Sequence, residues 1–194
     1  MVDTFLSPAD RAYTVPQVLR LASDNGLKFQ DWMDRHYYSV SALIPGEMSI
    51  FHLASRLPPE ERWHLVELLN QSLGMHCFLL CHPERDLNDI AIEFESSNAD
   101  ATWLTYIPHL RPPTEVICTS DQLLGTPATL QRAGKEFSIS AHEVSIFEKI
   151  DGQTSIAQIL AACSSTSTER QENLDIAFHL FSRMHEWDHI LYEI

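Results

Sequence analysis

The chain has 194 residues, of which 44% are hydrophobic and 21% are charged, and it carries a formal net charge of −14. This composition permits a packed core and argues against global disorder, while the negative charge disfavours non-specific binding to nucleic acid or anionic lipid. No hydrophobic run reaches transmembrane length, and the start Met-Val-Asp-Thr lacks a basic signal segment, so we expect a cytoplasmic protein without membrane contact. The four cysteines form no C-x-x-C pair and are expected to be reduced thiols.

The first elements in chain order are a short apolar strand, a loop, a helix and a second strand. The apolar run at residues 2–6 predicts the first strand, and Thr14 followed by Pro16 indicates a helix start. Apolar residues then recur at helical spacing until Asn25-Gly26 ends the helix, and residues 27–33 continue as a strand. A single helix between two strands cannot bury its own faces, so this segment needs a larger sheet.

The same segment resembles the end of class I S-adenosylmethionine-dependent methyltransferases, specifically their last helix and penultimate strand. More narrowly, Asp3-Thr4-Phe5-Leu6 followed by Asp10-Arg11-Ala12-Tyr13-Thr14-Val15 resembles a motif that follows the catalytic core in a group of bacterial methyltransferases. The resemblance covers residues 2–38. It implies that Asp10, Arg11 and Tyr13 line the binding site of the methyl acceptor. The alternative is a structural loop, in which Asp10 or Thr14 caps the helix and Arg11 pairs with a carboxylate.

The chain departs from that family in its glycines. Class I methyltransferases hold their cofactor on a Gly-rich loop, whereas the six glycines here are isolated and form no G-x-G pair. We therefore expect no cofactor and no catalytic residue in this chain, with S-adenosylmethionine bound elsewhere in the complete enzyme.

The middle of the first half is expected to contain two helices and a strand. Helices are predicted at residues 47–56 and from Leu57-Pro58-Pro59-Glu60 to Gly74, and a strand at residues 75–81. The resemblance implies that this strand pairs antiparallel with residues 27–33, the two helices forming an insertion. His76, Cys77, Cys81 and His82 are metal-capable, but strand geometry places at most two of them on one face. We therefore expect a buried, cysteine-lined strand rather than a zinc site.

The second half is expected to consist of a connector and a helical domain. Residues 103–116 contain three prolines and are expected to form no regular element. Helices are predicted at residues 141–150, 155–162 and 169–187, followed by a strand at 190–192. This order, with Ile150-Asp151-Gly152 before Ile156, resembles a winged-helix domain. Residues 136–194 hold ten acidic and three basic side chains, so DNA would be repelled.

Together these observations predict an α+β protein: a remnant of the C-terminal edge of a Rossmann-like methyltransferase with a helical insertion, followed by a winged-helix-like domain. The expected boundaries are 1–94 for the methyltransferase elements, 95–135 for the connector and 136–194 for the winged-helix-like domain. The expected function is substrate recognition or regulation in a methyltransferase, silent in catalysis alone and partnered by the catalytic domain. The alternative is a non-enzymatic protein–protein interaction module, and a homodimer is open under either. A fragment should leave the sheet edge unpaired, whereas a self-sufficient module should bury it.

Overall fold

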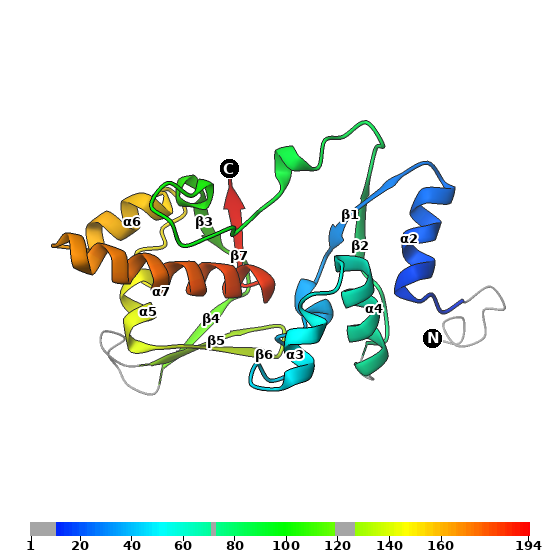
Figure 1. Cartoon of the computed structure of the whole chain (residues 1–194), viewed down its shortest axis with the longest axis horizontal. Helices are drawn as coiled ribbons and strands as arrows, with labels where there is room; N and C mark the ends of the chain where they lie inside the picture. Colours follow the sequence, from blue (N-terminus) through cyan, green and yellow to red (C-terminus); the bar gives the residue numbers. More distant parts are fainter. Residues whose placement is uncertain (1–10, 71–72, 119–126) are drawn as a thin grey trace. The chain divides into compact units, whose positions relative to one another are not determined.

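The computed structural model describes residues 11–70, 73–118 and 127–194, which form two compact units (Figure 1). The first unit spans Met1–Arg85 and the second Asp86–Ile194. The strand expected at residues 2–6 lies outside the described residues.

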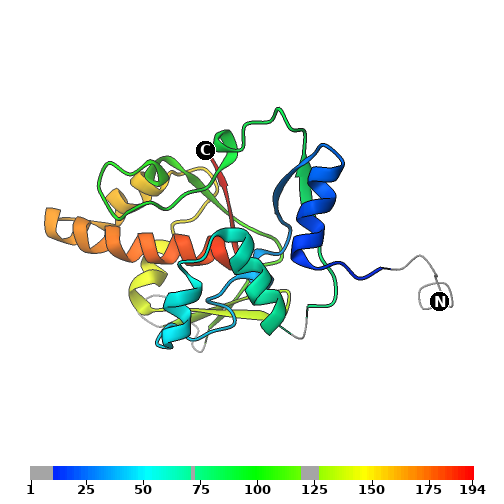
Figure 2. The ribbon, with the colours of Figure 1, turned by 45° about the vertical axis from the view of Figure 1, so that its right-hand side comes forward.

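The first unit contains three α-helices and one two-stranded sheet within its described part (Figures 1 and 2). Its elements are α2 (Val15–Asp24), β1 (Lys28–Trp32), the 3₁₀ helix η1 (Arg35–Tyr38), α3 (Ser49–Ala54), α4 (Pro59–Leu69) and β2 (Phe78–Cys81). The helix expected to reach Gly74 ends at Leu69, because Asn70 leaves the helical conformation. On α4, Val66 is buried whereas Leu68 is 67% exposed.

The antiparallel pairing of β1 with β2 is confirmed, although α3 and α4 intervene in the sequence. Lys28 pairs with Cys81 and Trp32 with Phe78, with an irregularity between Phe29 and Asp31. In the described part of the chain this sheet has two strands, so β1 has a strand neighbour on one side. Val15 and Val18 of α2 pack with Trp32 and Tyr38 in a common core, which explains the apolar spacing seen in the sequence.

The second unit places three helices against antiparallel strands. Its elements are η2 (Asn88–Ile90), η3 (Thr102–Thr105), β3 (Ile107–Leu110), β4 (Glu115–Cys118), β5 (Ala128–Arg132), β6 (Lys135–Ile139), α5 (Ala141–Phe147), α6 (Ile156–Cys163), α7 (Ser167–Glu186) and β7 (Ile190–Glu193). β4, β5 and β6 form one sheet, and β3 pairs with β7 in another. The N-caps of the three helices are Ser140, Ser155 and Thr166, each of which forms a capping box with the residue three positions later.

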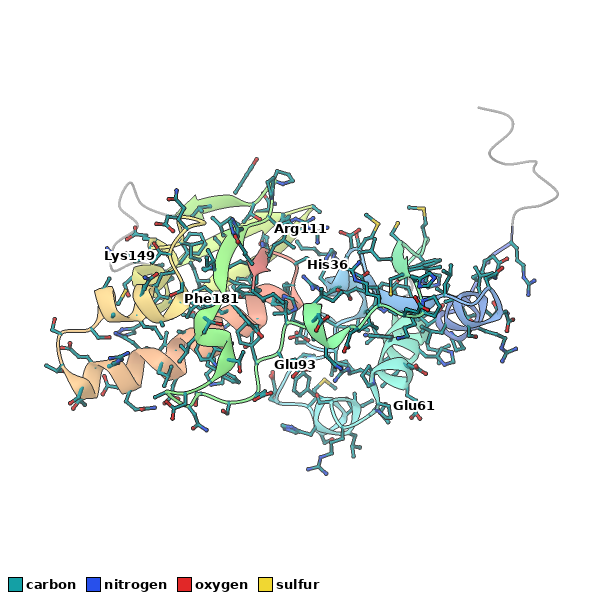
Figure 3. The ribbon with its side chains drawn as sticks, turned by 90° about the horizontal axis from the view of Figure 1, so that it is seen from above. His36, Glu61, Glu93, Arg111, Lys149 and Phe181 are labelled. Atoms are coloured by element: carbon teal, nitrogen blue, oxygen red, sulfur yellow. The ribbon has the colours of Figure 1, made fainter. Side chains whose placement is uncertain are left out.

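The proline-rich segment was expected to lack regular structure, and that expectation was wrong. Pro108 lies inside β3 opposite Tyr192 of β7. A proline is tolerated there because β3 has β7 as its neighbour in a two-stranded sheet, so the missing N–H can face away from the ladder. Arg111, labelled in Figure 3, secures the end of the pair: its guanidinium donates to Asp188 at 2.8 Å and its backbone N–H to the backbone oxygen of His189.

The core of the second unit draws on elements from most of its length. Phe181 of α7, labelled in Figure 3, is fully buried with Ile159 of α6 and Leu130 of β5. Trp103 of η3 belongs to the same core, so part of the segment expected as a connector is packed into this unit. The boundary at Arg85 also lies earlier than the expected boundary at residue 94.

The two units are mixed helix and strand with small antiparallel sheets, in agreement with the α+β class. Among the described residues, none of the helices combines the length and the hydropathy that crossing a membrane requires.

Candidate functional site

The carboxylate of Glu67 on α4 joins that helix to the start of α2. Glu67 Oε2 accepts a hydrogen bond from the backbone N–H of Val15 at 3.0 Å. Val15 is the first residue of α2, where backbone N–H groups have no acceptor within the helix. A carboxylate at this end is also stabilised by the helix dipole. Glu67 therefore fixes the start of α2, which follows Arg11 and Tyr13 in the sequence, relative to α4.

Glu67 continues into a chain of side-chain hydrogen bonds. Its Oε1 lies 3.1 Å from His76 Nε2, and His76 Nδ1 lies 2.7 Å from the hydroxyl of Tyr38. A neutral imidazole with its proton on Nε2 satisfies both contacts, donating to Glu67 and accepting from Tyr38. His64 Nε2 lies 4.0 Å from Glu67 Oε2 at the edge of this chain.

Tyr38 is held as a protonated phenol. Its ring is buried and stacks on Trp32 with centroids 3.8 Å apart. Burial raises the pKa of the Tyr38 hydroxyl well above its ordinary value, and the nearby Cys77, Glu67 and Asp34 add to the shift. The hydroxyl therefore remains a donor to His76 across the physiological range.

A cavity of about 400 Å³ lies beside these hydrogen-bonded side chains, and two of the three residues predicted to bind substrate line it. Arg11 and Tyr13 both line it, and the Arg11 guanidinium lies 5.2 Å from the centre of the Tyr13 ring. Asp10 lies outside the described residues. The remaining walls are formed by Ala12, Val18, Leu21, Glu67, Leu73, Gly74, Met75, His76 and Phe78.

The alternative interpretation of the loop is supported for Thr14 and not for Arg11. Thr14 is the N-cap of α2, and its backbone N–H donates to the Gln17 side chain at 3.0 Å. In the part of the chain that the structure describes, Arg11 has no carboxylate within ion-pair distance. Its guanidinium lies over the Tyr13 ring in the wall of the cavity.

A second cavity of about 360 Å³ shares residues 73–75 with the first as part of its lining. It is lined by Asp34, Tyr37, Tyr38 and Cys77 as well as Leu73, Gly74 and Met75. Tyr38 lines one cavity and His76 the other, so their hydrogen bond connects the two. The phenol, the imidazole and the carboxylate thus form one series of hydrogen bonds.

The side chains of residues 76–82 that could bind a metal differ in their surroundings and partners. His76 is engaged by Tyr38 and Glu67, and Cys81 is buried in β2. His82 is exposed and lies 3.8 Å from Glu84.

The sequence did not reveal that Tyr38, Glu67 and His76 act together. The spacing of His64 and Glu67 on one helix was the nearest signal, and it is too common to identify a site. Their proximity depends on the β1–β2 pairing, which brings the segment before β2 next to η1.

The cavity thus offers a cation, an aromatic ring, apolar walls and a carboxylate–imidazole pair. Arg11 suits an anionic or carbonyl group, and the Glu67–His76 pair suits a proton-bearing polar group. A comparison with protein-family models found none that matches this chain.

Proposed function

We propose that this chain is the C-terminal substrate-recognition region of a bacterial class I methyltransferase that uses S-adenosylmethionine. The observation that carries the proposal is the antiparallel β1–β2 pair, because the resemblance to these enzymes implies a pairing of these two segments. In this proposal the pair closes the Rossmann-like sheet of a catalytic domain, and α3 with α4 is the inserted helical element.

Exposed apolar side chains on the first unit support the proposal that another domain covers it. Leu68 on α4 is 67% exposed, Met75 is 74% exposed, and Leu79 on β2 is 43% exposed. Within the described residues the β1–β2 sheet, which contains Leu79, has two strands, so it leaves an unpaired edge, and exposed large apolar side chains favour burial against another surface. The proposed occupant is the catalytic domain, because its parallel sheet would supply strands for this edge.

The cavity that contains Arg11 and Tyr13 is the proposed wall of the acceptor site. Its residues would orient the acceptor, while S-adenosylmethionine and the methyl-transfer centre would belong to the catalytic domain. Because Glu67 anchors the loop through Val15, the position of Arg11 would depend on the same network that contains His76.

Substitution of Arg11 in the complete enzyme tests this role. Arg11→Ala should raise the KM for the acceptor about tenfold and leave the KM for S-adenosylmethionine unchanged, because the lost contact is to the acceptor alone. Arg20→Ala is the matched control, since Arg20 is an exposed arginine on α2 that does not line the cavity. An Arg11→Ala enzyme with an unchanged acceptor KM would contradict the proposal.

The second candidate is a non-enzymatic interaction module with a winged-helix-like second unit. It is favoured by exposed Val116 and Ile117 on β4, which is an edge strand of its sheet in the described part of the chain. The acidic surface of this unit argues for a protein partner, a second copy of the chain included, rather than nucleic acid. If the chain sediments as a dimer and Ile117→Glu makes it monomeric, this candidate gains support. Both candidates are consistent with the cytoplasmic location expected from the sequence.

A further inference from the structure

The second unit contains a cavity of about 500 Å³ between η3, α6 and α7. Figure 1 shows η3 beside α6, and residues of both helices and of the segment entering η3 line the cavity. Its floor is apolar and is made by Leu104, Leu160 and Leu174, all of which are buried. A concave site of this size with an apolar floor and a few polar groups is typical of small-molecule binding sites.

The rim of this cavity holds two opposite charges that do not form an ion pair with each other. Asp100 and Arg170 both line it, and within the described ranges neither has an ion-pair partner or a side-chain hydrogen bond. Ser167 and Gln171 also line the rim and offer further hydrogen-bonding groups.

Two other hydroxyls of the cavity, those of Ser155 and Thr105, already donate hydrogen bonds within the protein. They therefore do not compete with Asp100 and Arg170 for the charged groups of a ligand. Ser155 Oγ donates to Gln158, and Thr105 Oγ1 donates to the backbone oxygen of Thr102 at 2.8 Å. The charges of Asp100 and Arg170 are consequently the strongest polar features of this cavity.

We propose that this cavity binds a small zwitterion with an apolar side chain, such as a free hydrophobic amino acid or a dipeptide. The ligand carboxylate pairs with Arg170, its ammonium group with Asp100, and its side chain lies on the three leucines. A singly charged ligand would leave one of the two rim charges facing a like charge or nothing, whereas a zwitterion matches both. The proposal is independent of the methyltransferase assignment, because every residue it uses belongs to the second unit.

Titration calorimetry with L-phenylalanine, its amide and its N-acetyl derivative tests the proposal. Both derivatives should bind at least about tenfold more weakly than the free amino acid, because each lacks one charge. Arg170→Gln should weaken binding of phenylalanine about tenfold but leave binding of the amide unchanged. Asp100→Asn should likewise weaken binding of phenylalanine about tenfold and leave binding of the N-acetyl derivative unchanged. Both variants change exposed side chains, so they should fold normally.

A volume test uses helix α6. Ala157→Phe should fill the cavity and abolish binding, whereas Ala161→Phe, an exposed position on α6 outside the cavity, should bind like the unmodified protein. The proposal would be overturned if neither phenylalanine nor a leucine-containing dipeptide gave a heat of binding. Equal affinity of the three phenylalanine compounds, or an Arg170→Gln protein with unchanged affinity, would also overturn it.

Discussion

The hydroxyl of Tyr38 and the Nδ1 atom of His76 are 2.7 Å apart, although 38 residues separate them in the sequence. This hydrogen bond connects η1, which follows β1, to the segment that precedes β2. It therefore reinforces the strand pairing at the end where Trp32 faces Phe78. Through Glu67, the same network reaches the start of α2 and the loop of Arg11.

Tyr38→Phe should destabilise the protein by about 1–3 kcal/mol, because it leaves the half-buried His76 Nδ1 without its donor. Urea denaturation followed by tryptophan fluorescence measures the change. Tyr13→Phe removes a hydroxyl from a tyrosine that is 38% exposed and should have little effect. Equal stability of the Tyr38→Phe variant and the unmodified protein would show that the bond makes no net contribution.

Gly152→Ala should destabilise the second unit by more than about 1 kcal/mol. Gly152 has a φ of +73°, and an added Cβ would lie 2.9 Å from His109 Nδ1. Gly134→Ala is the matched control, since its φ is +75° but no atom lies near its Cβ position. Thermal unfolding should show a larger loss for Gly152→Ala, and the difference between the two variants reports the His109 contact. Equal losses would mean that the conformation alone is responsible.

Phe181→Ala should cost about 3–5 kcal/mol of unfolding free energy, because it opens a cavity at a fully buried position. Leu191→Ala, at a position 46% exposed on β7, should change the stability by no more than about 0.5 kcal/mol. Chemical denaturation of both variants tests whether the core lies where the structure places it. Similar losses for the two would contradict that placement.

The stability contribution of Asp151 should depend on pH. Hydrogen bonds from the backbone N–H of Gln153 and the hydroxyl of Thr154 lower the pKa of this exposed carboxylate below its ordinary value near 3.8. A lowered pKa in the folded state means that the carboxylate stabilises the fold above pH 3.8, and that this stabilisation is lost as the pH falls through the folded-state pKa. Melting temperatures of Asp151→Asn and the unmodified protein should therefore differ at neutral pH and converge in acid. A difference that is constant with pH would refute the role of the charge.

Elements with regular apolar spacing were predictable from the sequence, because their apolar residues recur at the period that places them on one buried face. The helix at Val15 has its apolar residues on one face, and Asn25-Gly26 ends it as expected. The helices of the second unit are N-capped by serine or threonine residues that form capping boxes, which is a local signal.

The pairing of β3 with β7 was not predictable in the same way. Pro108 indicates an irregular segment when it is considered alone, and only the sheet-edge position in the folded chain makes it acceptable. The β1–β2 pair was expected from the family resemblance and not from spacing, since a long insertion separates the two strands.

The candidate site was predictable in part for a related reason. Arg11 and Tyr13 are neighbours in the sequence and line one cavity. Tyr38, Glu67 and His76 come from three separate segments, and no pattern within any one segment indicates that they meet.

The most direct test of the methyltransferase account is the DNA sequence immediately upstream of the Met1 codon. The account predicts an open frame continuous with this chain that encodes a strand, a Gly-rich loop and a helix, which would bind S-adenosylmethionine. An in-frame stop codon directly upstream would contradict the proposal that this chain is the C-terminal region of such an enzyme.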